Sequence, residues 1–362
     1  MRFINLRITA LNMSLLEQMG LREGSIRVTH SPVHSISLSP DIRLNVLDVE
    51  ETKLNDITFE ENNTHLEKLV ISKSLLSKVP VTVAHLATVV YITIKGTPIK
   101  IVDLSLFSRL QHLYSIDLSC NRIRLLQYTL ASDEDFPNLI EVHLSQNHLE
   151  AVNFDFFSRM KVLETLTLSS NRITHVDGSL VSSRLKYLDL SQNSIAAFSC
   201  CSWNASKIIT LTLNNNTLEQ LPACIEEAMA NVKFLHLSSN ALADGDSIWR
   251  RLVSMKRLEA LNIDSNQLTS AVLDDVLLSL TFVSLQRNRI KHLRVPFANH
   301  GLSITVRCNL IEQFDSESVS TNVTYLDMRC NPVDIGSYGE VQPIETSRVK
   351  DMKHVDECRE CY

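Results

Sequence analysis

The chain has 362 residues, of which 44% are apolar and 21% are charged. Enough apolar residues are present to build a large core, so the composition excludes wholesale disorder. The net charge is −6, with both signs mixed along the chain, which argues against nucleic acid or an anionic membrane surface as the partner. No stretch approaches the roughly 20 consecutive apolar residues that a membrane-spanning helix requires.

Residues 1–43 are expected to form an N-terminal cap. Their apolar residues recur at helical spacing, which predicts an amphipathic helix that covers the open first end of the fold. These residues are Ile4, Ile8, Leu11 and Leu15. The same stretch makes a poor secretory signal, because Arg7 interrupts the short apolar run and no small-residue cleavage site follows.

A repeated pattern occupies residues 44–333. It reads Leu-x-x-Leu-x-Leu-x-x-Asn-x-Leu, with other aliphatic residues or tyrosine accepted at the leucine places, and a clear copy begins at Leu113. About thirteen copies follow one another at a period of about 23 residues. We number the places of each copy from its first apolar residue. In the first three copies, the residues at the asparagine place are Thr52, Ser74 and Thr97.

Each copy predicts one short strand. The apolar residues at places four and six alternate with polar ones, so one side of the strand is buried and the other faces solvent. The asparagine at place nine is expected to stack on its neighbours and to hydrogen-bond backbone groups left unpaired where the chain leaves the strand. This asparagine ladder comprises Asn121, Asn147, Asn171, Asn193, Asn216, Asn240, Asn266, Asn288, Asn309 and Asn331.

The predicted fold class is therefore an α/β repeat solenoid. Side-by-side parallel strands form a concave inner sheet, and longer, more varied segments on the outside make the leucine-rich-repeat array curve. The outer segments carry few matching aromatic residues beyond Phe107 and Phe157, which favours irregular outer turns over uniform helices. Residues 334–362 are expected to cap the last copy, because an end copy exposes its apolar side.

Three cysteines are placed for a bond between neighbouring copies. Cys201 and Cys224 both occupy place seventeen of adjacent copies, and Cys200 stands one residue earlier. Stacking brings these places within bonding range, so a disulfide from Cys224 to either Cys200 or Cys201 is predicted.

The other cysteines allow more than one interpretation. Cys308 and Cys330 share place eight of adjacent copies, although Cys330 could instead bond Cys358 in the C-terminal segment. Disulfides of this kind would indicate an oxidising compartment. At Cys120, a free thiol and a disulfide-bonded sulfur are equally expected. No metal site is predicted, because the C-x-x-C that ends at Cys361 lacks two further ligands.

Residues 193–240 resemble the mosquito leucine-rich immune molecules. Here Ser199, Cys200 and Cys201 follow one matched copy and Cys224 follows the next, and in that family cysteines of this kind join neighbouring repeats in the middle of the array. The resemblance implies a secreted haemolymph protein that binds a protein partner, such as a thioester complement-like protein, in innate immunity. Long members end in a coiled coil, which this sequence lacks, so it would be a coil-less or truncated member.

Catalysis is not predicted. The sequence contains no H-E-x-x-H, G-x-S-x-G or G-x-x-x-x-G-K-[ST] motif, and only eight glycines with which to build phosphate-binding loops. His143 and His236 share place five with Asp117 and Asp189, so a His/Asp pairing is conceivable. Solvent-facing polar residues on short strands are the better interpretation. No cofactor is predicted.

The inner face is the predicted binding surface, because a long rigid surface loses little entropy on association. Exposed aromatic residues beside polar ones are typical of protein interfaces, although mutual packing of the aromatics along the strands would explain them equally well. The predicted site comprises Tyr187, Asp189, Phe234, His236, Asn262, Phe282 and Tyr325. Arg287, Arg307 and Arg329 add positive charge toward the C-terminal end, most simply as solvated surface charge.

The sequence thus predicts a secreted, non-catalytic immune protein of insects that binds another protein. The alternative is an intracellular repeat scaffold that regulates a phosphatase or signalling complex, and the poor signal sequence favours it. Neither hypothesis involves nucleic acid or a membrane span.

Overall fold

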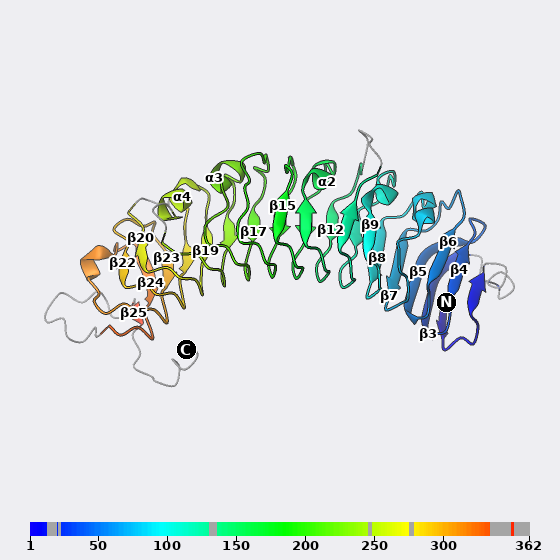
Figure 1. Ribbon diagram of the computed structural model, residues 1–362, viewed down its shortest axis with the longest axis horizontal. Coiled ribbons are helices and arrows are strands. Elements are labelled where there is room, and N and C mark those ends of the chain that lie inside the picture. Colours follow the sequence, from blue (N-terminus) through cyan, green and yellow to red (C-terminus); the bar gives the residue numbers. More distant parts are fainter. Residues whose placement is uncertain are drawn as a thin grey trace. The chain divides into compact units, whose positions relative to one another are not determined.

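The structure is a computed structural model that describes residues 1–12, 20, 23–129, 136–244, 248–274, 279–333 and 349–350. The chain divides into two compact units, residues 1–188 and 189–362. In both units one inner strand is followed by an outer segment in each repeat, and the repeats stack in parallel (Figure 1). The predicted solenoid of about thirteen turns is confirmed.

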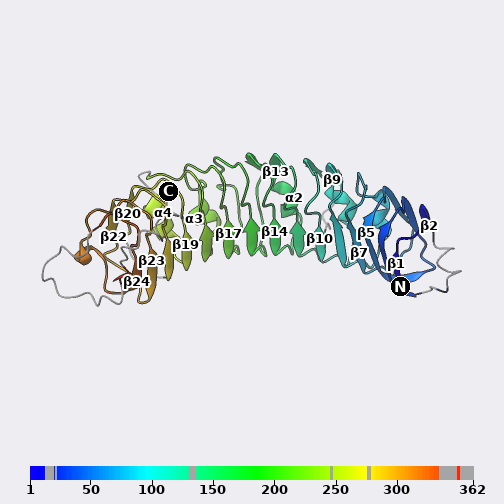
Figure 2. The ribbon, with the colours of Figure 1, turned by 90° about the horizontal axis from the view of Figure 1, so that it is seen from below.

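The first unit is built on a row of parallel inner strands, which Figure 2 shows lying side by side. They are β1 (Arg2–Ile4), β3 (Glu23–Ser31), β5 (Arg43–Thr52), β7 (Lys68–Ser72), β8 (Tyr91–Lys95), β10 (Ser115–Asp117), β12 (Glu141–His143) and β14 (Thr165–Thr167), with β16 (Tyr187–Asp189) at the unit boundary. Their register aligns Ile116 with Val142, and Val142 with Leu166. Place-four residues therefore stack into one continuous core, where all three are fully buried.

The outer side of the first unit is irregular, as the patchy aromatic pattern predicts. It contains small parallel sheets and single helical turns, and Phe107 and Phe157 are fully buried beneath them. The sheets are β2 (Ala10–Asn12) with β4 (Ser35–Leu38) and β6 (Asp56–Phe59), β9 (Ile101–Asp103) with β11 (Leu125–Gln127), and β13 (Ala151–Asn153) with β15 (His175–Asp177); the helical turns are η1 (Val81–His85), η2 (Leu104–Phe107) and α2 (Asp155–Ser158).

The expected N-terminal helix is wrong where the structure describes the segment. Arg2–Ile4 and Ala10–Asn12 are strands β1 and β2, whereas Leu15 lies outside the described residues. β1 pairs with β3 and β2 with β4, so their backbone groups are satisfied by neighbouring turns of the solenoid. Phe3 and Leu11 are buried between exposed neighbours, which is the period-two burial of a strand.

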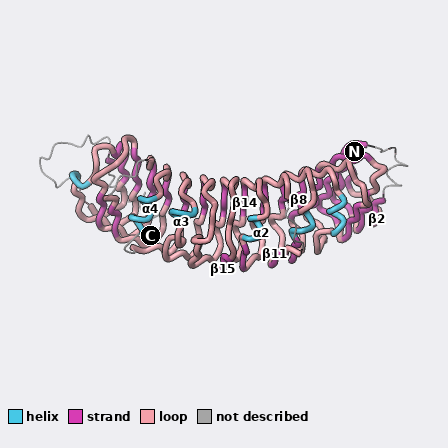
Figure 3. The backbone as a smooth tube through the Cα atoms, turned by 90° about the horizontal axis from the view of Figure 1, so that it is seen from above, coloured by secondary structure: helices cyan, strands magenta, loops and turns pink. Residues whose placement is uncertain are grey.

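The second unit repeats this design. Its inner strands are β17 (Thr210–Thr212), β18 (Phe234–His236), β19 (Ala260–Asn262), β21 (Phe282–Ser284), β23 (Leu302–Thr305), β24 (Val323–Asp327) and β25 (Val349–Lys350). Its outer elements are α3 (Ile225–Ala228), α4 (Ile248–Ser254), η3 (Ser316–Ser318) and the pair β20 (Ser270–Val272) and β22 (His292–Arg294). Figure 3 shows how brief the helical turns are beside the loops. No helix among the described residues is long and apolar enough to cross a membrane.

Both proposed caps stay predictions. In the N-terminal one, residues 1–43, β3 pairs in parallel with β5, so the inner sheet already runs through that segment. Most of the C-terminal one, residues 334–362, lies outside the described residues.

The asparagines at place nine seal the turns between successive strands. The amide Nδ2 of Asn216 donates to the carbonyl oxygens of Leu190 and Leu213, both at 3.0 Å, and its Oδ1 accepts from the backbone N–H of Ile195 at 3.0 Å. Each asparagine therefore joins its own turn to the preceding one. The same set of bonds is made by Asn147, Asn171, Asn240, Asn266, Asn288, Asn309 and Asn331. Asn121 also donates to two carbonyl oxygens, but its Oδ1 accepts from the backbone N–H and the hydroxyl of Thr97.

Candidate binding face

The candidate binding face is the solvent-facing side of the inner sheet in the second unit. Its register aligns Phe234 of β18 with Ala260 of β19, and Ala260 with Phe282 of β21. Adjacent strands lie about 4.8 Å apart, so one short side chain stands between two large aromatic ones. Phe234 is 37% exposed and Phe282 is 42% exposed. Tyr325 is placed further along, because Phe282 aligns with Ser303, and Ser303 with Tyr325 of β24.

Polar residues at place five accompany these aromatics. His236 aligns with Asn262, and Asn262 with Ser284, on the same three strands. Burial lowers the pKa of His236, and the nearby carboxylate of Asp189 only partly offsets this effect. His236 therefore offers a neutral ring that can both donate and accept a hydrogen bond.

One carboxylate on this side was missed by the sequence reasoning. Asp264, at place seven, has a raised pKa because it is largely buried, although Oδ1 accepts a hydrogen bond from the backbone N–H of Gln286 at 2.8 Å. Only its position, two residues after the outward-facing Asn262, could have pointed to it.

The predicted arginine cluster has carboxylates beside it. Arg329 donates from Nη2 to Oδ2 of Asp327 at 2.6 Å and from Nε to Oδ1 at 2.9 Å. Although burial works in the opposite direction, these bonds keep the pKa of Asp327 below its ordinary value, with help from Arg307. Arg287 likewise lies near Asp264. The cluster is therefore not a free cationic patch.

The seven predicted site residues divide between the two units. Tyr187, which is 49% exposed, belongs to the first unit, whereas Asp189 begins the second. The structure brings the other five onto neighbouring strands, β18 to β24. They are Phe234, His236, Asn262, Phe282 and Tyr325.

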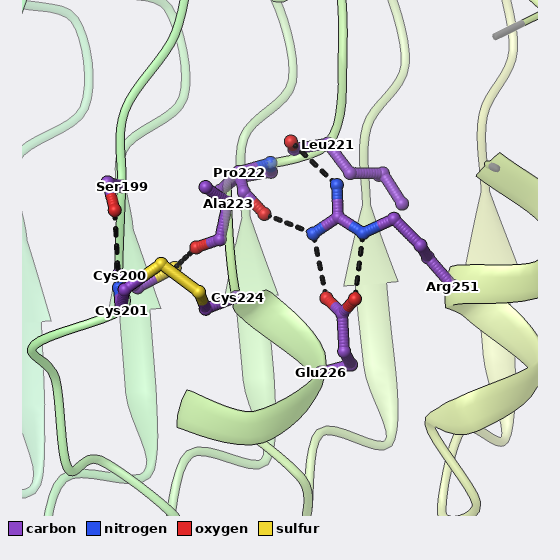
Figure 4. The surroundings of a disulfide bond; sticks show 9 residues. All are labelled: Ser199, Cys200, Cys201, Leu221, Pro222, Ala223, Cys224, Glu226 and Arg251. Carbon is purple, nitrogen blue, oxygen red and sulfur yellow. Dashed lines mark hydrogen bonds and ion pairs between the residues drawn. A yellow bond between two sulfur atoms is a disulfide. The ribbon is translucent and has the colours of Figure 1, made fainter. Parts of the chain in front are cut away.

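Figure 4 shows the disulfide between Cys201 and Cys224, on the outer side of the second unit. Their Cα atoms are 4.9 Å apart and the residues are separated by 23 positions in the chain. Cys200 stays a free, buried thiol whose Sγ donates to the carbonyl oxygen of Ala223 at 3.2 Å. Burial raises the pKa of this thiol to about 12, so it is protonated and unreactive at neutral pH.

The remaining described cysteines differ in state. Cys308 and Cys330 are each in a disulfide, whereas Cys120 is a free, exposed thiol that contacts Oε1 of Gln146 at 2.8 Å. Cys358, the other predicted partner of Cys330, lies outside the described residues. Disulfides thus include four of the six described cysteines.

An ion pair braces the neighbourhood of the disulfide. Arg251 of α4 donates from Nε and Nη2 to the two carboxylate oxygens of Glu226 in α3, at 2.8 and 2.7 Å (Figure 4). The same guanidinium donates to the carbonyl oxygens of Leu221 and Pro222, at 3.1 and 2.6 Å. Arg251 therefore holds the segment that carries Cys224 against the next turn.

Comparisons with known proteins agree with this architecture. The family model described as leucine rich repeat matches residues 137–197. Tsukushi of Xenopus tropicalis is 36% identical over 133 residues, which are 35% of this chain and 37% of that protein. The match thus spans little more than a third of that curated relative's length.

Two solved structures share the fold at low identity. The crystal structure of the APL1 leucine-rich repeat domain has a TM-score of 0.54 and 15% identity, and the match covers 97% of this chain and 98% of that one. A chain of the octameric complex of Latrophilin 3, Unc5D and FLRT2 has a TM-score of 0.53 and 16% identity, over 71% and 79% of the two chains. The repeat pattern, the asparagine-bonded turns and these matches together show that the chain has the leucine-rich-repeat fold.

Proposed function

We propose that the protein is a non-catalytic scaffold that binds a protein partner through the inner face of its second unit. The observation that carries the proposal is the exposure of Phe234 and Phe282 on a strand framework that holds them in place. Large aromatic side chains supply much of the energy at protein interfaces. His236 and Asn262 lie beside them as uncharged hydrogen-bonding groups, which suits the centre of an interface, where charged residues are depleted.

Rigidity supports the same proposal. Each inner strand is hydrogen-bonded to its neighbours, and the asparagine ladder fixes the turn that follows it. A surface held in this way loses little conformational entropy when a partner binds. The fold likeness to a chain from a multi-protein complex is an analogy that favours protein binding over catalysis.

The proposed location is extracellular. Disulfides are rare in reducing compartments, and Cys201, Cys224, Cys308 and Cys330 are all oxidised. The bond from Cys201 to Cys224 joins neighbouring repeats in mid-array, which is the feature that resembles the mosquito immune family. That resemblance favours a haemolymph protein whose partner is a thioester complement-like protein.

Removing both exposed phenylalanines is expected to weaken partner capture. A Phe234→Ala variant that also carries Phe282→Ala should capture a purified thioester complement-like protein from insect haemolymph at least about tenfold less well. Its melting temperature should move by no more than about 2 °C, because neither ring is in the core. Biolayer interferometry with thermal unfolding of the same samples measures both quantities.

A matched control variant removes equally exposed apolar groups of the same unit that lie off the inner face. Phe297 is 55% exposed and Leu310 is 41% exposed. Phe297→Ala with Leu310→Ala should leave capture unchanged. Unchanged capture in the inner-face variant, or an equal loss in the control, would place the binding surface elsewhere.

One observation favours the second candidate, an intracellular scaffold. Cys120 is an exposed thiol without a disulfide, and a reducing compartment preserves such a group. Counting thiols in unfolded protein before and after reduction distinguishes the two candidates. We expect no more than four free thiols before reduction and eight after it, since four of the eight cysteines are in disulfides. Eight free thiols in unreduced protein would contradict the extracellular proposal.

A further inference from the structure

Arginines without carboxylate partners line one edge of the first unit. Arg122 and Arg172 occupy place ten of their turns, Arg124 occupies place twelve, and all three side chains are exposed. His148 occupies place ten of the turn between them. The backbone N–H groups of Arg122, His148 and Arg172 each donate to the preceding turn, at 2.8 to 3.1 Å, so the three residues stand in a column along the stack.

His148 stands between Arg122 and Arg172 in this column. Its pKa is lowered, first by burial and then by the positive charges of Arg172, Arg124 and Arg122. The Nδ1 atom of the ring is buried and has no hydrogen-bond partner.

Some other arginines of the fold have carboxylate partners. Arg27 bonds Asp48 and Glu50, both at 3.1 Å, and Arg251 bonds Glu226. Among the ion pairs between described residues, none includes an arginine of the edge cluster. Their charges are therefore available to an anionic ligand.

We propose that this basic edge, formed by Arg122, Arg124, His148 and Arg172, binds a sulfated polysaccharide. A guanidinium group can bond two oxygens of one sulfate, and its hydration is weak enough to allow close contact. Turns repeat at about 4.8 Å, so the arginines of the first and third turns stand about 10 Å apart on either side of the turn that carries His148 and Glu150. A linear polyanion lying along the stack can contact both of these arginine-bearing turns.

The residues around the column favour a polysaccharide over single-stranded nucleic acid. Single-strand binding relies on aromatic side chains that stack on the bases. At places ten and twelve of these turns the only residues besides the cluster are Glu150 and Thr174, so no aromatic residue stands there. Sulfated polysaccharides occur outside cells, so the choice of this polyanion rests on the proposed extracellular location.

Heparin is the probe for the test, with the purified full-length chain. Arg122→Gln with Arg172→Gln should weaken heparin binding by about tenfold or more. The slope of log affinity against log salt concentration should fall by about two, because each arginine neutralises one anionic group. The control, Arg109→Gln with Arg184→Gln, removes the same charge from exposed arginines outside the column and should leave both quantities unchanged.

Three results would overturn the proposal. They are an equal loss of binding in the control variant, undiminished binding to desulfated heparin, and tighter binding to a single-stranded oligonucleotide or to phosphatidylserine vesicles than to heparin. The assay needs neither the protein partner nor the secretory pathway. Failure of heparin binding is therefore distinguishable from failure of partner capture or of the thiol count.

Discussion

Replacement of Asn147 by alanine should lower the free energy of unfolding by about 3 kcal/mol or more. Asn147 is 4% exposed, and its Nδ2 donates to the carbonyl oxygens of Leu118 and Leu144, at 2.9 and 3.0 Å. Its Oδ1 accepts from the backbone N–H of Ile123 at 3.0 Å. Alanine would leave the buried N–H of Ile123 without a partner, which costs about 1–3 kcal/mol. It would also remove one hydrogen bond from each carbonyl, at about 0.5–1.5 kcal/mol each, although Asn121 and Asn171 still donate to Leu118 and Leu144. Urea denaturation followed by circular dichroism measures the change.

Asn138→Ala provides the matched control from the same repeat array. The exposed amide of Asn138 donates to the carbonyl oxygen of Gln111 at 2.6 Å, where water can replace it. We expect a loss of less than about 1 kcal/mol. Similar small losses in both variants would contradict a structural role for the asparagine ladder.

The fold was predictable because each repeat contains the residues that specify its own strand and turn. Apolar residues such as Val142 and Leu144 alternate with polar ones, and Asn147 follows at a constant distance. This information is local, and it recurs in almost every turn. Stacking then needs no long-range pairing that the sequence would have to specify separately.

The N-terminal turns were not predictable in the same way. The copy that contains β3 has Ile26 and Val28 at its core places, but it has Ser31 where asparagine is expected. Ser31 is 3% exposed, and its Oγ accepts a hydrogen bond from the backbone N–H of Leu6 at 3.0 Å. This hydroxyl therefore replaces one of the hydrogen bonds that an asparagine side chain makes in the later turns. Short apolar runs fit helix and strand equally well, and only the neighbouring strand β5 decides between them.

The inner-face residues could be placed by sequence, but their charge state could not. Alternation along the strand assigns His236 and Asp327 to the solvent-facing side. Burial among neighbouring strands and the bonds from Arg329 then set their pKa values, and both depend on the stacked structure. The same limit applies to the basic edge, because the cluster around His148 joins residues from three different turns.

The choice between Cys200 and Cys201 also lay beyond the sequence. Both residues are near place seventeen, and a shift of one position moves a side chain from the core to the surface. In the structure Cys200 is fully buried and Cys201 is exposed, so only Cys201 meets Cys224 on the outer side.

After the loss of Asn147, removal of the Cys201–Cys224 disulfide should cause the largest loss of stability. Cys201→Ala with Cys224→Ala is expected to lower the free energy of unfolding by about 3 kcal/mol, because the bond closes a loop of 23 positions and restricts the unfolded chain. Urea denaturation without reductant gives the value. Cys120→Ala, at a free and exposed thiol, should change stability by less than about 0.5 kcal/mol.

The single variant Cys201→Ala separates the native bond from its neighbour. It leaves Cys200 in the chain, but that thiol is buried, donates to the carbonyl oxygen of Ala223 and has a pKa of about 12. The Cys200 thiolate is therefore scarce at neutral pH, and the buried Cys200 sulfur is poorly accessible to Cys224. We expect the single and double variants to lose the same stability, with Cys224 free in the single one. Wild-type stability in the single variant, with a Cys200–Cys224 peptide in a non-reducing digest, would show that the two cysteines are interchangeable.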